Sequence, residues 1–190
     1  MRSMLLSCLL LAAFFVLERT LRQGDEAVSM EAGPADRGTS RLIAVGFLST
    51  LMSGVLAPVL ARLGLGRSSG PRLRAAGLSM MVAGLGMKIW AMRTLGRFYT
   101  RTLRMASEQT VVQDGPYRLV RHPGYLGTLL VWAGFGWAMG NWLLAGLNTA
   151  ALLVVYGRRI QVEEAMLTET LGEPYRAYRK RTWRLLPGLI

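Results

Sequence analysis

Residues 125–156 read YLGTLLVWAGFGWAMGNWLLAGLNTAALLVVY, and this stretch decides the fold class. It consists of two apolar runs, residues 125–139 and 142–156, which are separated by Gly140 and Asn141 and contain no charged side chain. A helix as long as one of these runs reaches about 22 Å, whereas the hydrocarbon core of a bilayer is about 30 Å thick. The stretch therefore predicts a tight helical hairpin, tilted in a membrane or entering it partway, with Asn141 near the turn.

Three further apolar runs precede this hairpin, at residues 4–17, 42–63 and 75–95. The 190 residues are 52% apolar, with a mean hydropathy of +0.30, and the runs mostly lack the polar faces that a water-soluble helical protein needs. We therefore expect an all-α integral membrane protein with about five transmembrane helices, of which the first is an uncleaved span. Lys88, near the end of the third run, is expected to extend its ammonium group to the membrane interface.

The chain is expected to form one structural domain with two parts. Residues 1–110 comprise the first three transmembrane helices and their connecting loops. Residues 111–190 comprise the hairpin and a polar tail. The single cysteine, Cys8, excludes a disulfide framework and a paired-cysteine metal site.

Charge is distributed unevenly along the chain, which carries a net charge of +12. The arginines cluster in the segments between apolar runs, as expected beside anionic lipid headgroups, so we expect membrane lipids and no nucleic acid as partners. With five spans, residues 18–41, 93–124 and the tail after residue 156 share one face, and together they hold most of the 23 Lys and Arg residues. The positive-inside rule places this face, with the C-terminal tail, in the cytoplasm.

Two polar segments on that face hold the residues that suit chemistry. The first, GPYRLVRHPGYLG at residues 115–127, contains His122, the only histidine of the chain. Pro123 suits the first turn of the next helix, whose free amides can hold an anion, and Gly124 and Gly127 would allow close approach of a ligand. A structural hydrogen-bonding role for His122 is the alternative. With one histidine and one cysteine, a zinc site of a common type is excluded.

The second polar segment, residues 158–187, is predicted to be helical. It contains an adjacent pair of carboxylates, Glu163 and Glu164, which point in different directions on a helix. A solvated ion pair between Glu163 and Arg159 is the alternative interpretation. Two tyrosines, at positions 175 and 178, lie on one helical face, where packing is their alternative role.

The ordered set of GPYRLVRHPGYLG, VEEAML, LGEPYRAYRKR and LLP closely resembles the C-terminal signature of the isoprenylcysteine carboxyl methyltransferase family and the related phospholipid methyltransferases. The resemblance covers residues 111–190, while the first three spans fit only by hydropathy. It implies an integral membrane methyltransferase that uses S-adenosylmethionine without a soluble Rossmann domain. It also implies a cofactor pocket at the cytoplasmic face and no metal.

The resemblance implies roles for individual residues. His122 would hold the cofactor's carboxylate, a glutamate would accept from its ribose or ammonium, and tyrosines would flank its adenine. The implied cofactor-binding residues are Tyr117, Arg121, His122, Pro123, Tyr125, Gly127, Glu163, Glu164, Tyr175 and Tyr178. Arg121, Glu163 and Glu164 are the implied catalytic residues. The candidates for pairing with an acceptor's carboxylate or phosphate are Arg158, Arg159 and Arg176.

The acceptor stays open at this point: a prenylcysteine-like or prenylated molecule, an aminophospholipid or a small thiol. Three alternatives to carboxyl methylation also stay open. These are a phospholipid N-methyltransferase, an NADPH-dependent sterol-type reductase and a non-catalytic membrane module. Against the reductase, the tail lacks the further His, Asp and Cys positions typical of that group. The sequence does not predict an oligomeric state.

Overall fold

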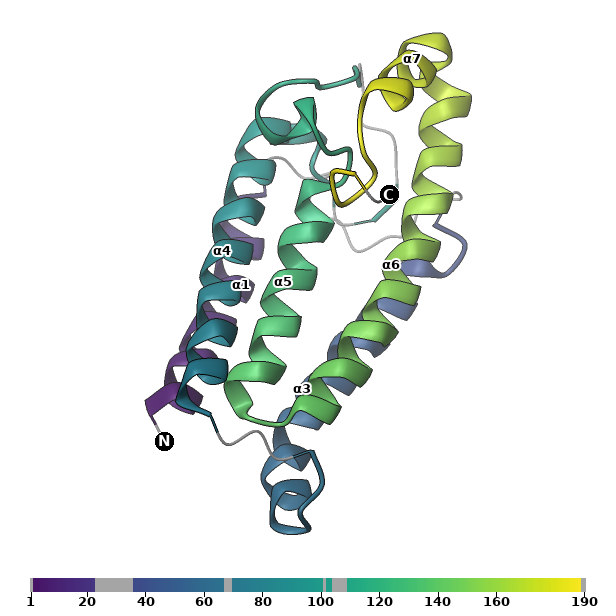
Figure 1. Ribbon diagram of the computed structural model, residues 1–190. Coiled ribbons are helices and arrows are strands. Elements are labelled where there is room, and N and C mark those ends of the chain that lie inside the picture. Colours follow the sequence, from purple (N-terminus) through teal and green to yellow (C-terminus); the bar gives the residue numbers. More distant parts are fainter. Residues whose placement is uncertain (1, 23–35, 67–69, 101, 104–108, 189–190) are drawn as a thin grey trace.

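The computed structural model describes residues 2–22, 36–66, 70–100, 102–103 and 109–188. Its elements are helices joined by loops, and Figure 1 shows the long helices arranged as a bundle. The helices are α1 (Arg2–Thr20), α3 (Thr39–Arg62), α4 (Pro71–Leu95), α5 (Pro123–Met139), α6 (Trp142–Leu171) and α7 (Glu173–Arg181), with short 3₁₀ turns η2 (Gly96–Phe98) and η3 (Gly115–Arg118).

Four helical segments of the described chain are long and apolar enough to cross a membrane: Arg2–Thr20, Thr39–Arg62, Pro71–Phe98 and Trp142–Leu171. The fifth predicted span, α5, has 17 residues and lies inside the bundle (Figure 1). Many large apolar side chains on α1 and α3 are exposed, as expected for helices that face lipid. The predicted fold class, an all-α multi-pass membrane protein, is confirmed.

Glycines bring α4 and α5 into close backbone contact. A Cβ atom on Gly84 would lie 2.6 Å from the carbonyl oxygen of Gly127, and one on Gly127 would lie 2.7 Å from that of Gly84. Gly77 and Gly134 make an equivalent contact two turns away. Small residues at such crossings permit the close packing that drives helix association in membranes. The α4–α5 pair is therefore a rigid wall for the rest of the bundle.

The hairpin turn lies where the sequence predicted it. Gly140 ends α5 in the left-handed region with φ of 81°, and the Asn141 side chain caps α6 by accepting a hydrogen bond from the amide of Leu144 at 3.1 Å. The predicted length of the second arm is wrong, because α6 has 30 residues and is about 45 Å long. Strong helix formers after residue 156 continue the helix beyond the apolar run.

The prediction of one helix over residues 158–187 is also wrong. α6 ends at Leu171 and is followed by Gly172, whose φ of 61° favours glycine, and α7 is a separate helix of nine residues. The tail then returns to the loop before α5 (Figure 1), where the Arg121 amide donates to the Trp183 carbonyl at 2.8 Å and the Trp183 amide donates to the Leu119 carbonyl at 2.9 Å. This contact fixes the loop that carries His122.

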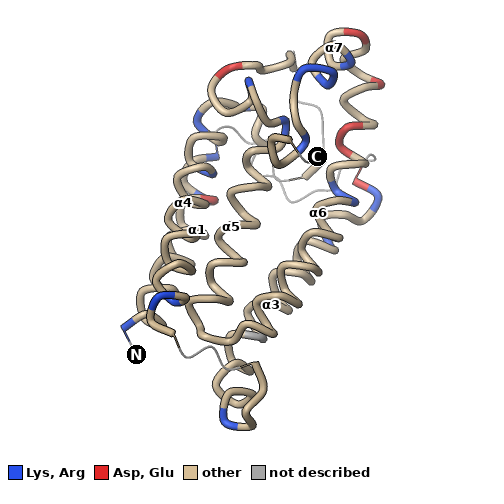
Figure 2. The backbone as a smooth tube through the Cα atoms, in the orientation of Figure 1, with Lys and Arg blue, Asp and Glu red and all other residues tan. Residues whose placement is uncertain are grey.

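Charged residues lie mainly toward the two ends of the bundle (Figure 2). The acidic residues of the described chain lie toward the end where α7 is found, together with many of the basic ones. The middle of the bundle is apolar and is centred on Trp132, whose ring stacks on Phe47 with centroids 5.1 Å apart and meets Phe14 and Phe135 edge to face. The polar end of the bundle is therefore the place to look for a site.

Candidate active site

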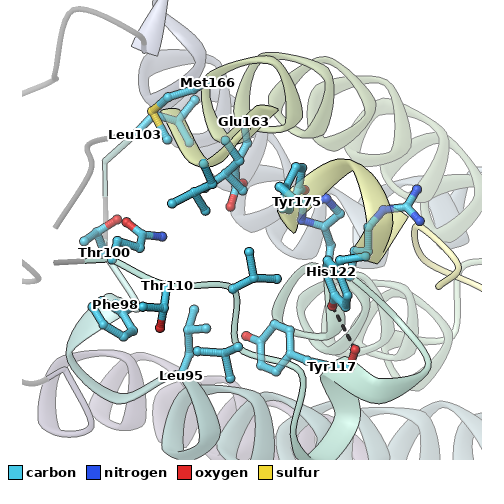
Figure 3. Close-up of a pocket in the computed structure, with 17 residues that line it drawn as sticks. Leu95, Phe98, Thr100, Leu103, Thr110, Tyr117, His122, Glu163, Met166 and Tyr175 are labelled. Carbon is cyan, nitrogen blue, oxygen red and sulfur yellow. Dashed lines mark hydrogen bonds between the residues drawn. The ribbon is translucent and has the colours of Figure 1, made fainter. Parts of the chain in front are cut away.

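Two cavities adjoin at the polar end of the bundle, and we call them the outer and the inner cavity. The outer cavity lies under α7, and Figure 3 shows Glu163 and Tyr117 reaching it from different sides. The inner cavity lies among the helices and has a volume of about 370 Å³. Tyr117, Arg121, His122 and Glu163 line both cavities. They form the boundary between the two spaces together with four other residues that also line both: Leu95, Phe98, Thr100 and Leu103.

His122 is held rigidly at the start of α5. Its carbonyl accepts hydrogen bonds from the amides of Tyr125 and Leu126, both at 3.1 Å, so two of the amides predicted to be free for an anion are already used. The imidazole is 6% exposed and stacks on the Tyr125 ring with centroids 5.6 Å apart. Its Nε2 atom lies 3.4 Å from a carboxylate oxygen of Glu164. These contacts orient the ring at the cavity boundary.

Glu164 ties α6 to this loop and to the tail. It is 3% exposed and accepts hydrogen bonds from Arg121 at 2.8 Å and from Arg184 at 2.9 Å, with Arg179 within 3.6 Å. Arg121 also donates to backbone carbonyls of Arg179 and Thr182. Glu164 is absent from the residues that line either cavity, so its contacts in the described chain are structural.

Glu163 points the other way, as predicted for adjacent residues on a helix. Its carboxylate accepts a hydrogen bond from the Tyr125 hydroxyl at 2.6 Å, and that hydroxyl in turn accepts one from Arg159 at 3.2 Å. Arg159 is 2% exposed and pairs with Asp36 at 2.5 Å. The alternative interpretation of Arg159 as half of a solvated surface ion pair is therefore wrong.

Asp36 was not predicted from the sequence as part of the site. Burial alone would raise the pKa of its carboxyl, but hydrogen bonds from Ser40 and the charge of Arg159 lower that pKa below its usual value. The carboxylate is thus held ionised beside Arg159. The sequence gives little indication that Asp36 and Arg159 pair, because 123 positions separate them.

Three tyrosines form part of the outer cavity. The Tyr178 hydroxyl donates to the Tyr117 carbonyl at 2.8 Å, and the rings of Tyr175 and Tyr178 lie 5.9 Å apart. Burial raises the pKa of Tyr117 well above its usual value and that of Tyr178 to about 12. The phenols therefore stay protonated near neutral pH, where they can pack against a ring and donate hydrogen bonds.

Several residues named from the sequence lie elsewhere. Arg158 and Arg176 are exposed, and Arg176 pairs with Glu173 at 3.5 Å, so only Arg159 of the three candidate arginines lines a cavity. Pro123 begins α5, and Gly127 packs against α4 instead of facing a ligand. The first of the two glycines, Gly124, does line the inner cavity.

The expectation that Lys88 extends to the interface is wrong. Its side chain is buried at 5% exposure, its ammonium pairs with Glu18 of α1, and it donates a hydrogen bond to Thr128 at 2.8 Å. Lys88 and Glu18 both line the inner cavity. Hydropathy could not reveal this pair, because its two residues lie on different helices that pack side by side.

Residues 77–169 match the model of the isoprenylcysteine carboxyl methyltransferase family. A probable protein-S-isoprenylcysteine O-methyltransferase of Oryza sativa subsp. indica is 33% identical over 119 residues, which are 58% of this chain and 59% of that protein. The corresponding enzyme of Schizosaccharomyces pombe is 30% identical over 57% of this chain and 47% of its own length.

A methanethiol S-methyltransferase of Pseudomonas deceptionensis is 39% identical over 74 residues, which cover 38% of this chain and 27% of that protein. Among solved structures, a eukaryotic intramembrane Ras methyltransferase of the isoprenylcysteine carboxyl methyltransferase type superposes with a TM-score of 0.66 at 20% identity, over 95% of this chain and 64% of the other. The chain thus spans about half of the length of the isoprenylcysteine O-methyltransferases that it matches, and 27% of the methanethiol S-methyltransferase. The family resemblance and the fold predicted from the sequence are confirmed.

Proposed function

We propose, from its resemblance to the isoprenylcysteine carboxyl methyltransferase family, that this chain is a membrane methyltransferase. It uses S-adenosylmethionine and transfers a methyl group to a lipophilic acceptor with a prenylcysteine-like carboxylate. The observation that carries the proposal is the shared wall of Arg121, His122 and Glu163 between two cavities. A methyl donor in the outer cavity and an acceptor in the inner cavity would meet where these shared residues lie.

The outer cavity has a volume of about 80 Å³ and is lined by residues that suit the chemistry of the cofactor. Leu95, Val112 and Leu167 provide an apolar surface for an adenine, and protonated phenols lie beside it. Glu163 offers a carboxylate to the positive charges or hydroxyls of the cofactor, and His122 offers a ring nitrogen to its carboxylate. The residues that line the outer cavity therefore match the chemistry of S-adenosylmethionine.

The inner cavity suits an amphiphilic acceptor. Phe14, Phe15 and Phe47 provide an aromatic wall on α1 and α3, while Arg159 and Lys88, each paired with a carboxylate, contribute cations to the lining. Its volume of about 370 Å³ lies in the range of roughly 300–1,000 Å³ that is typical of small-molecule sites. A hydrocarbon tail would lie against the aromatic rings, with entry between the helices from the lipid, and the carboxylate would reach the boundary.

The chain's contribution to the reaction is positional. When bound, S-adenosylmethionine supplies an electrophilic methyl group, and the transfer needs alignment more than proton movement. Arg121, clamped by Glu164 and the tail, presents its guanidinium at the boundary and can orient the acceptor carboxylate. The buried wall excludes water from a step that neutralises charge. The basic residues at the α7 end support a cytoplasmic location for the tail and the outer cavity.

A direct assay tests the proposal. Purified protein in lipid nanodiscs would receive methyl-labelled S-adenosylmethionine and either N-acetyl-S-farnesylcysteine or methanethiol, with Arg176→Gln as a control for exposed charge. Base-labile label in the farnesylated acceptor, reduced at least tenfold in Glu163→Gln, is the expected result. Label in methanethiol alone would favour the second candidate, a thiol methyltransferase, which the similarity to the Pseudomonas deceptionensis enzyme suggests. No transfer, together with NADPH binding, would contradict methyltransferase function.

A further inference from the structure

Tyr125 contacts two of the side chains that face both cavities. Its hydroxyl donates a hydrogen bond to the Glu163 carboxylate at 2.6 Å, and its ring stacks on the His122 imidazole with centroids 5.6 Å apart and an interplanar angle of 14°. Tyr125 lies in the first turn of α5, Glu163 lies on α6, and His122 immediately precedes α5. A single side chain thus joins the two elements that meet at the cavity boundary.

We propose that Tyr125 is a positioning residue for the cofactor that acts through both of these neighbours. Its hydroxyl fixes the Glu163 carboxylate, and its ring fixes the His122 imidazole. This inference rests on the proposed function. It differs from the direct cofactor contact that the family resemblance implies, because Tyr125 lines the inner cavity and is not among the described residues that line the outer one. The effect of Tyr125 on the cofactor is therefore indirect.

The hydroxyl restrains the carboxylate without using it up. It donates to the Oε2 atom of Glu163, and a carboxylate has two oxygens that accept hydrogen bonds, so the other oxygen can accept from a ligand. The same hydroxyl accepts a hydrogen bond from Arg159 at 3.2 Å, which directs its own proton toward Glu163. A bond from a neutral donor to a charged acceptor is stronger than one between neutral groups, so it can hold the carboxylate in one orientation.

The ring restrains the imidazole. Tyr125 is supported on its own side by Tyr156, whose ring centroid lies 4.9 Å away at an interplanar angle of 37°. The His122 ring thus has an aromatic face against it, while its Nε2 atom lies 3.4 Å from a carboxylate oxygen of Glu164. Contacts at a face and at an edge leave the imidazole little freedom to rotate, and such alignment is what a transfer between two bound molecules requires.

The contribution of the hydroxyl is tested by calorimetric titration of the full chain in detergent with S-adenosylhomocysteine. Tyr125→Phe removes the hydroxyl and keeps the ring, and we expect it to weaken binding three- to tenfold. In a Glu163→Ala chain the carboxylate is gone, so we expect the same change to cost less than twofold. Thr149→Val is the control and is expected to bind normally, because it removes a hydroxyl on α6 that donates to the Ala145 carbonyl and lines neither cavity.

The contribution of the ring is tested in the same titration. Tyr125→Leu removes the ring as well as the hydroxyl, and we expect it to bind at least threefold more weakly than Tyr125→Phe. In a His122→Ala chain there is no imidazole to orient, so we expect the leucine and phenylalanine variants to bind equally within twofold. If Tyr125→Leu fails to fold, the hydroxyl comparison alone decides.

A merely structural role for Tyr125 predicts a different pattern. A general loosening of the fold does not depend on whether Glu163 carries its carboxylate, so Tyr125→Phe would then cost the same factor in both backgrounds. Equal losses in the two backgrounds, or normal binding by Tyr125→Phe in the original chain, would overturn the inference while the proposed function stands. Absence of binding by the original chain would contradict the proposed function itself, and the inference would fall with it.

Discussion

Replacing Glu164 with glutamine tests whether this residue anchors the site instead of contacting ligands. The substitution keeps the size of the side chain but removes a buried charge that holds Arg121, Arg179 and Arg184. Breaking a buried pair by removing one partner costs about 3–5 kcal/mol. Arg179 and Arg184 are partly exposed and can regain water, whereas the Arg121 side chain is 8% exposed and cannot. We therefore expect the lower end, about 3 kcal/mol.

This loss can be measured as a change in melting temperature. For a chain of this size, 1 kcal/mol corresponds to about 2–4 °C, so Glu164→Gln is expected to melt about 6–12 °C lower. Tryptophan fluorescence of the detergent-purified protein provides the assay. Glu163→Gln makes the same chemical change one residue earlier, and Glu173→Gln makes it in an exposed pair; both are expected to stay within about 3 °C of the original chain. A Glu164→Gln protein that melts within 2 °C of the original would refute the anchoring role.

Three further substitutions test other parts of the structure. His122→Ala is expected to weaken S-adenosylhomocysteine binding about tenfold in a chain that still folds, although loss of the buried ring lowers the melting temperature; unchanged affinity would remove the residue from the site. Gly127→Val places atoms against the Gly84 carbonyl and is expected to cost about 1–3 kcal/mol or more, measured by thermal melting, whereas Gly146→Val in open space is expected to be tolerated. Lys88→Met is expected to destabilise the chain, because it removes one of the two cations, the other being Arg22, that pair with the largely buried Glu18; a melting temperature equal to that of the original chain would argue against a buried pair.

The sequence predicts those features of the fold that depend on local chemistry. The hairpin turn at Gly140 and Asn141 follows from a glycine that accepts positive φ and an asparagine that caps a helix, so its position could be read directly. The divergence of Glu163 and Glu164 follows from helical geometry. Helix length was less predictable, because α6 continues through polar residues that have high helix propensity but no apolar signal.

Contacts between distant segments could not be predicted in the same way. The pairing of Asp36 with Arg159 and that of Glu18 with Lys88 each require knowledge of which helices lie side by side. The role of Glu164 as an anchor depends on the tail returning to the loop before α5, which a break at Gly172 makes possible. Hydropathy identifies helices but not their neighbours, and for this reason buried charge pairs in membranes are found only once the packing is known.

Binding of a methyl donor in the outer cavity, where the two cavities adjoin, can be measured by a calorimetric titration of the detergent-purified chain with S-adenosylhomocysteine, with NADPH as the parallel ligand. We expect saturable binding of S-adenosylhomocysteine alone, weakened at least tenfold by Glu163→Gln. Saturable binding of NADPH without S-adenosylhomocysteine would instead indicate a reductase.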